Sequence, residues 1–150
     1  MFRGITQVNL DAKGRLAIPT RFRDVIEQRC AQKMVLTVDH RERCLLLYPA
    51  PDWATVESQI NAMPNHTKAA RRLQYMMVGH ATDLDLDSAG RIMLPAVLRE
   101  HARLEKRVVL MGQNSRFEIW SETLWQAKTE AYLADEDDDA DADALAGFTL

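Results

Sequence analysis

Apolar and polar residues alternate along two stretches of the chain, and each stretch leads into the same short motif. Thr6–Leu10 and Thr82–Leu86 carry apolar side chains at alternate positions, which is the period of a half-buried β-strand. Each stretch is followed by an Asp-x-x-Gly-Arg segment, a second apolar run and a proline. The chain is therefore predicted to contain the same strand–turn–strand unit twice.

The turn in each unit is predicted from its aspartate and its glycine. The segment Asp11-x-x-Gly14 recurs as Asp87-x-x-Gly90. An aspartate carboxylate can accept hydrogen bonds from backbone N–H groups two residues on, and glycine adopts positive φ without a Cβ clash. These four residues are therefore expected to build two tight turns, and this role is favoured over direct contact with a ligand.

Each unit is predicted to continue into a short helix and a β-hairpin. Pro19 and Pro95 are expected at the first helical positions, because proline fixes φ near the helical value. Two apolar runs flank a polar turn in residues 34–48 and again in residues 108–120, which is typical of a hairpin. Ser121 is expected to cap a final helix.

The segment between the two units is predicted to hold two helices. Asp52 is placed to cap the first helix, and the apolar stripe that begins at Trp53 indicates core packing rather than a ligand site. The second helix is expected to start at Asn65 or Thr67 and to run to Gly79.

Charge is distributed unevenly along the chain. The 150 residues include 19 Lys and Arg and 22 Asp and Glu, which gives a formal net charge of −3. Seven of the acids lie in residues 135–143, so residues 1–133 carry a positive surplus. A moderately basic body is compatible with nucleic-acid binding, although a small surplus decides nothing alone. The acidic, aromatic-poor segment is predicted to be disordered.

The cysteines and the lack of long apolar runs indicate a compartment. Cys30 and Cys44 have no metal-ligand spacing and are expected to be free thiols in a reducing cytoplasm. No apolar run approaches the roughly 20 residues that a membrane helix needs. We therefore predict a soluble, cytoplasmic protein.

Catalytic motifs are not visible in the sequence. Asp83, Asp85 and Asp87 alternate along one strand, but Ser88 stands where a calcium loop requires glycine. The histidines are scattered without a His-x-x-x-His pair, and there is no Gly-x-Ser-x-Gly segment. We therefore predict no enzyme activity, no cofactor and no metal site.

The repeated motif resembles that of a known superfamily. Leu-Asp-x-x-Gly-Arg, followed by three largely apolar residues and proline, is similar to the hallmark of the AbrB/SpoVT swapped-hairpin superfamily of DNA-binding proteins. Two copies narrow the resemblance to the MraZ family. The similarity also covers Met1-Phe-Arg-Gly4, Pro19-Thr-Arg-Phe-Arg23 and Gly112-Gln-Asn-Ser-Arg-Phe-Glu-Ile-Trp120. It spans about residues 1–133 and excludes the acidic tail.

The resemblance implies an α+β, mainly β, fold in which two tandem swapped-hairpin repeats form one β-barrel-like body with flanking helices. The expected divisions are the first repeat at 1–50, linking helices at 51–80, the second repeat at 81–133 and the disordered acidic tail at 134–150. It also implies closed-ring homo-oligomers and a nucleoid-associated bacterial transcriptional regulator. Such a regulator binds double-stranded DNA at repeated promoter boxes of the cell-division and cell-wall gene cluster, typically its own operon.

The resemblance also implies a DNA-binding surface. In proteins of this superfamily the strand–turn–strand unit presents its basic side chains to DNA. The matching positions here are Lys13 and Arg15, with Arg91 as the counterpart in the second copy. Arginine can donate two hydrogen bonds to guanine O6 and N7 or clamp a phosphate, and Arg15 is the leading candidate. The alternative for both arginines is an ion pair with the aspartate of the same turn, worth under about 1 kcal/mol if exposed.

Three further basic residues lie close in sequence to the first motif: Arg3, Arg21 and Arg23. They are expected to contact phosphates without reading bases, and a solvated face is an equally supported alternative. The second copy has Ala89 in place of Lys13 and Val97 in place of Arg21, so it is expected to bind DNA less strongly. The rival function is a ring-forming scaffold or interaction protein without sequence-specific DNA reading.

Overall fold

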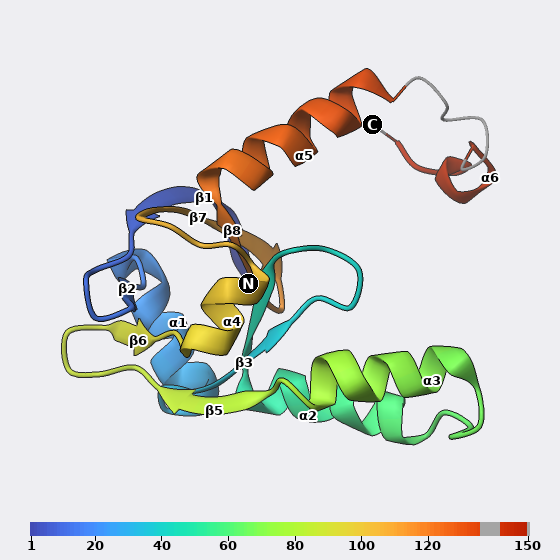
Figure 1. Cartoon of the computed structure of the whole chain (residues 1–150), viewed down its shortest axis with the longest axis horizontal. Coiled ribbons are helices and arrows are strands. Elements are labelled where there is room, and N and C mark those ends of the chain that lie inside the picture. The colour runs from blue at the N-terminus through green and yellow to red at the C-terminus, as the bar shows by residue number, and fades with distance from the viewer. Residues whose placement is uncertain (136–141, 150) are drawn as a thin grey trace.

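The computed structural model describes residues 1–135 and 142–149, which fold as two repeats of the same element order (Figure 1). The first repeat comprises β1 (Phe2–Asn9), β2 (Arg15–Ala17), α1 (Thr20–Cys30), β3 (Lys33–Val38) and β4 (Leu45–Pro49). The linking segment comprises α2 (Ala50–Asn61), α3 (Lys68–Leu73) and the π-helical turn η1 (Gln74–Val78). The second repeat comprises β5 (Thr82–Asp85), β6 (Arg91–Met93), α4 (Ala96–His101), β7 (Arg107–Asn114) and β8 (Phe117–Ser121). The helices α5 (Glu122–Ala134) and α6 (Ala142–Leu145) follow it.

The strands pair mainly between repeats. Six of them form one antiparallel sheet in the order β1-β7-β8-β4-β3-β5, and β2 pairs with β6 in a separate two-stranded ribbon. Strand β1 lies along β7 of the second repeat, and β5 lies along β3 of the first repeat. Each repeat thus supplies its first strand to the hairpin of the other, so the two repeats fold as one body.

The expectation of a β-barrel-like body is wrong in one respect, because the sheet is not a closed barrel. Strands β1 and β5 are the two edges of the six-stranded sheet and do not pair with each other. The ribbon strands β2 and β6 have three residues each and bond to one another. They are too short to connect the two edges through a continuous hydrogen-bonded ladder.

Both faces of the central sheet are covered by apolar packing. On one face the ribbon, α1 and α4 enclose a cluster that includes Leu16, Ile92 and Phe117, each fully buried. On the other face α2, η1 and α5 pack over Val35 and Trp120. Strands β3 and β4 are therefore buried on both sides, which explains their nearly continuous apolar sequence.

Several predicted boundaries differ in detail. Pro19 and Pro95 are the N-cap residues of α1 and α4, with extended ψ of 139° and 147°, rather than the first helical residues. Helix α2 begins at Ala50, so Asp52 lies in its first turn and makes no side-chain cap. The Asp52 carboxylate instead accepts hydrogen bonds from Arg29 Nε and Nη2, at 3.1 and 2.8 Å.

Other predicted features are confirmed. Both hairpins form, and the Ser121 Oγ accepts a hydrogen bond from Leu124 N at 3.1 Å as the cap of α5. Thr67 caps α3, accepting from Ala70 N at 3.1 Å. The helix predicted to run to Gly79 is α-helical only to Leu73. The chain then continues directly as the π-helical turn η1.

The C-terminal segment is described only in part. Residues 136–141, which carry most of the acidic run, and residue 150 lie outside the described residues. Where the tail is described, α6 forms a single helical turn, and the predicted disorder of the acidic run stays a prediction. Cys30 and Cys44 are free thiols, as predicted. In the described part of the chain, no helix combines the length and apolar character required to cross a bilayer.

Candidate nucleic-acid interface

The first repeated motif forms a tight turn that is closed by its own aspartate. Asp11 Oδ1 accepts hydrogen bonds from the backbone N–H groups of Lys13 and Arg15, at 2.9 and 2.8 Å. The same carboxylate binds Arg15 Nε through Oδ2 at 2.8 Å. Gly14 has φ +83°, a conformation that disfavours residues with a side chain. The aspartate and glycine thus build the turn as predicted, and the turn holds the guanidinium of Arg15 in a fixed direction.

The second motif reproduces this geometry closely. Asp87 Oδ1 accepts from the backbone N–H groups of Ala89 and Arg91, both at 2.9 Å, and Asp87 Oδ2 binds Arg91 Nε at 2.9 Å. Gly90 has φ +74°. In both turns the arginine bonds its aspartate through Nε, and the Nη atoms make no hydrogen bond to any residue that the structure describes. The predicted alternative of an ion pair within the turn is therefore present, and it leaves the outer edge of each guanidinium available.

These bonds lower the pKa of both aspartates. The backbone N–H of Arg15 is the main cause of the lowered pKa of Asp11, with a smaller contribution from its side chain. The backbone N–H of Arg91 lowers the pKa of Asp87 in the same way. Each carboxylate therefore stays ionised at neutral pH and keeps its arginine oriented.

The two motifs meet in the β2–β6 ribbon, where Arg15 lies opposite Met93 and Ala17 lies opposite Arg91. Leu16 and Ile92 alternate with them and are fully buried, so the other face of the ribbon points outward. Arg15 and Arg91 are diagonal neighbours on that face, a relation that places Cα atoms roughly 7–8 Å apart in antiparallel sheets. Both turns project from the same end of the molecule, away from α3 and α5 (Figure 1).

The other predicted basic residues occupy different surroundings. The side chains of Lys13 and Arg3 are exposed. Arg21 is also exposed, donating from Nη2 to Thr6 Oγ1 at 2.9 Å and lying 4.6 Å from the centre of the Phe22 ring. These contacts place Arg21 on α1 against β1, so that its charge lies near the N-terminal strand rather than on the ribbon.

Arg23, predicted to contact a phosphate or to lie on a solvated face, is only partly accessible. Its side chain is half-buried, and Nε donates to Ile18 O at 2.9 Å. Its guanidinium packs against Gly90, the glycine of the second turn. The position therefore belongs partly to the scaffold of the interface.

Lys106 is a basic residue near the first turn that was not among the residues predicted from the sequence. Its carbonyl accepts from Leu10 N at 2.8 Å, and it lines a shallow hollow together with Asp11 and Ala12. The pairing of β1 with β7 brings it there from the second repeat. The corresponding bond beside the second turn runs from Leu86 N to the uncharged Gln32 at 3.2 Å.

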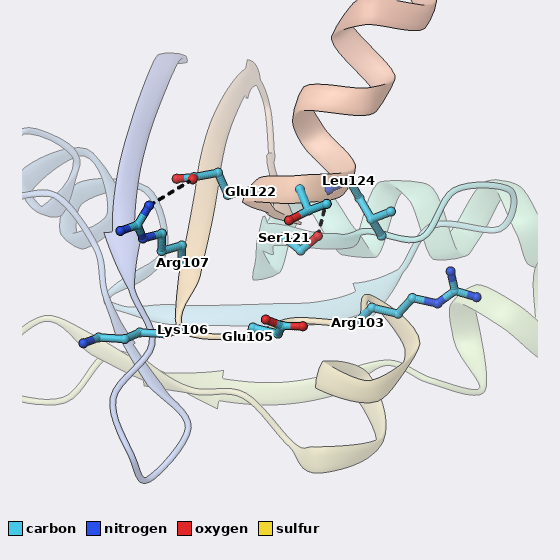
Figure 2. Close-up of a pocket in the computed structure, with 8 residues that line it drawn as sticks. Arg103, Glu105, Lys106, Arg107, Ser121, Glu122 and Leu124 are labelled. Atoms are coloured by element: carbon cyan, nitrogen blue, oxygen red, sulfur yellow. Dashed lines mark hydrogen bonds and ion pairs between the residues drawn. The ribbon is translucent and has the colours of Figure 1, made fainter.

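A second hollow, of about 510 Å³, lies between the α4–β7 connection and the start of α5 (Figure 2). It contains basic and acidic residues, and an ion pair joins Arg107 Nη1 to Glu122 Oε1 at 3.6 Å. Ser121 could suggest a nucleophile, but its Oγ is engaged in the helix cap. The mixed charge and the lack of a base bonded to this hydroxyl among the described residues give no basis for catalysis here.

One group of metal-ligand side chains also comes together in the described part of the chain. Ligand atoms of Asp39, Cys44 and Glu118 lie within 4.8 Å of one another. Burial raises the pKa of the Cys44 thiol well above its usual range, and the Glu118 carboxylate adds to this effect. Asp39 Oδ1 is already bonded to two backbone N–H groups. A protonated thiol is a poor ligand, so these residues do not fit a metal centre well.

Comparison with known proteins gives matches to both repeats. A family model described as "MraZ protein, putative antitoxin-like" matches residues 1–76 and 77–148. A Legionella pneumophila protein named transcriptional regulator MraZ is 48% identical over 136 residues, which cover 91% of this chain and 90% of that protein. Proteins of the same name from Thioalkalivibrio sulfidiphilus and Alkalilimnicola ehrlichii are 46% and 45% identical. The match to the Thioalkalivibrio protein covers 97% of this chain and 96% of that protein, and the match to the Alkalilimnicola protein covers 100% of both.

Proposed function

This chain belongs to the MraZ family, and we propose that it is a DNA-binding transcriptional regulator that reads sequence through the outer face of its β2–β6 ribbon. The observation that carries the proposal is the ribbon itself. It presents Arg15 and Arg91 on one outward face, each bonded by Nε to a turn aspartate and each with its Nη atoms directed to no described partner. The names of the relatives support the regulatory role.

A two-stranded ribbon is narrow enough to enter the major groove of B-DNA, which is about 12 Å wide. An arginine held at Nε can still offer an Nη–H pair to guanine O6 and N7 or to a phosphate. Because the turn fixes the guanidinium before DNA binds, little side-chain freedom is lost on binding. The Asp11 and Asp87 carboxylates therefore orient the arginines and do not contact DNA themselves.

The two halves of the interface contribute unequally in this proposal. Lys13 and Lys106 place positive charge beside the first turn, and Arg3 and Arg21 add charge along β1 and α1. These residues bind phosphates and position the protein on the duplex. Ala89 and Val97 supply no charge at the matching places in the second repeat, so Arg91 makes the weaker contact.

We further propose that several copies assemble in a ring that binds repeated promoter boxes in the protein's own cell-division and cell-wall operon. Each ribbon then makes a modest contact, and the effective concentration within the assembly raises the total affinity. The exchange of first strands between repeats is consistent with the swapped hairpin of the wider superfamily.

The proposal is tested by fluorescence-anisotropy titration of labelled DNA from upstream of the operon at two salt concentrations. Wild type is compared with Arg15→Ala, Arg91→Ala and the control Arg29→Ala. Arg29 is also ion-paired with an aspartate at 2.8 Å, but on the α1–α2 side of the molecule. We expect salt-sensitive, sequence-selective binding that collapses in Arg15→Ala, weakens in Arg91→Ala and is retained in Arg29→Ala.

Circular dichroism and oligomer size confirm that each variant folds and assembles. Random DNA of equal length measures selectivity. Equal binding by all four proteins would assign only structural roles to the turns. Absence of binding by folded wild type to both DNAs would favour the ring-forming scaffold instead.

A further inference from the structure

Arg23 and Arg99 occupy the same position in the two repeats, and each side chain lies against the turn of the other repeat. Both arginines are half-buried. Neither forms an ion pair with a described acidic residue, and each uses Nε to bond a backbone carbonyl of its own repeat. The arrangement is reciprocal, and it follows from the crossing of the two units in the ribbon.

The contacts of Arg99 lead directly to the first turn. Arg99 Nε donates to Leu94 O at 2.9 Å, and Leu94 N donates to Gly14 O at 2.9 Å. The guanidinium covers Gly14 so closely that a Cβ atom added there would lie 3.0 Å from Arg99 Cζ. A residue of the second repeat therefore holds the turn that carries Arg15.

Arg23 makes the equivalent contacts with the second turn. Its Nε donates to Ile18 O at 2.9 Å, and Ile18 N donates to Gly90 O at 2.9 Å. A Cβ atom added to Gly90 would overlap Arg23 Nε and would lie 2.5 Å from its Cζ. The first repeat therefore holds the turn that carries Arg91.

We propose that Arg99 and Arg23 are crossed positioning residues, so that each repeat sets the orientation of the DNA-reading arginine in the other. This inference rests on the proposed DNA-binding function and goes beyond it by assigning a role across the repeats. Arg23 and Arg99 then act on DNA through the turns, not by phosphate contact. A charged side chain is suited to this place because its flat guanidinium can stack on a glycine while Nε fixes the preceding carbonyl.

The proposal predicts crossed coupling in double-mutant cycles of DNA affinity. Residues in one hydrogen-bonded network commonly couple by enough to change an equilibrium constant about twofold to 150-fold. Arg99→Ala should weaken DNA binding by about that factor in wild type and have little further effect in the Arg15→Ala background. In the Arg91→Ala background it should retain its full effect. Arg23→Ala should show the opposite pattern, coupling with Arg91 and adding independently to Arg15→Ala.

Lysine substitutions separate positioning from direct phosphate binding. Arg99→Lys keeps the positive charge but lacks the Nε–H that bonds Leu94 O. If Arg99 positions the turn, Arg99→Lys should behave like Arg99→Ala, and the slope of log affinity against log salt should stay near that of wild type. Wild-type affinity in Arg99→Lys together with a reduced slope in Arg99→Ala would instead identify a phosphate contact and overturn the proposal.

A readout without DNA keeps the inference distinct from the function on which it rests. In free protein, Arg99→Ala should shift the backbone amide NMR signals of Lys13 and Gly14 more than those of Ala89 and Gly90. Arg23→Ala should do the reverse. Crossed shifts without any DNA binding by wild type would support the crossed packing of Arg23 and Arg99 on the turns and would reject the DNA-binding function. Uncrossed or equal shifts would reject the positioning roles, even if wild type binds DNA tightly.

Discussion

The two turns share one backbone design but differ in the side chains that surround it. Corresponding hydrogen bonds that Asp11 and Asp87 accept agree in length to within 0.1 Å, and the two glycines have φ of +83° and +74°. Two lysines lie at the first turn: Lys13 within it and Lys106 beside it. Ala89 replaces the former at the second turn.

The same contrast extends along the ribbon and the following helices. Met93 and Val97 are 49% and 64% exposed in the second repeat. The matching residues in the first repeat are Ala17 and Arg21. The Asp, Gly and Arg that close each turn are thus identical, whereas these exposed positions differ between the repeats. The shared residues therefore set the common turn geometry, and under the proposed function the unequal DNA contact would reside in the residues that project from it.

The largest expected effect comes from adding a side chain to the shared backbone. Gly14→Ala and Gly90→Ala should each lower the free energy of unfolding by about 1–3 kcal/mol, because alanine is strained at positive φ and its Cβ meets an arginine of the other repeat. Gly90→Ala should be the more destabilising, since its Cβ overlaps Arg23. Urea denaturation monitored by circular dichroism measures both.

Gly147 provides a matched control for these substitutions. It also has positive φ, at +95°, but no heavy atom lies within 4 Å of an added Cβ. Gly147→Ala should therefore change the free energy of unfolding much less. If all three alanine variants lost the same stability, the crossed packing of the turns would contribute nothing.

An intermediate effect is expected from exchanging the charge that distinguishes the turns. Lys13→Ala should weaken DNA binding and reduce the slope of log affinity against log salt by about 1, whereas Ala89→Lys should raise both. The double variant Lys13→Ala/Ala89→Lys keeps the net charge and tests whether location matters. Affinity equal to wild type in the double variant would show that the two turns are interchangeable.

The smallest effect should appear in acid. The folded pKa values of Asp11 and Asp87 are lowered from the usual 3.8, chiefly by the backbone N–H groups of Arg15 and Arg91. A lowered pKa stabilises the fold above pH 3.8, and this stabilisation is lost as the pH falls through the folded pKa values. Carboxyl ¹³C NMR should show both aspartates titrating below pH 3.8. Titration of only one below that value would break the equivalence of the turns.

Much of the local structure was predictable because it depends on residues close together in sequence. Asp-x-x-Gly closes its turn through bonds spanning two to four residues, and Ser121 caps α5 three residues away. The ion pair of Arg15 with its own aspartate was also foreseen as an alternative. The prediction was wrong by one residue at the N-termini of α1 and α4. Pro19 and Pro95 are the N-cap residues there, and the helices begin at the next residue.

The sequence by itself determined the two strand–turn–strand units, their hairpins and the basic residues of the first motif. Only the tertiary structure decided that the units cross, that the six-stranded sheet stays open, and that Lys106 lies beside the first turn. It also decided that Arg23 and Arg99 pack on the glycines of the opposite repeat. The physical reason is that hydrogen bonding within a turn is local, whereas pairing between β1 and β7 or β2 and β6 depends on which apolar faces can be buried together.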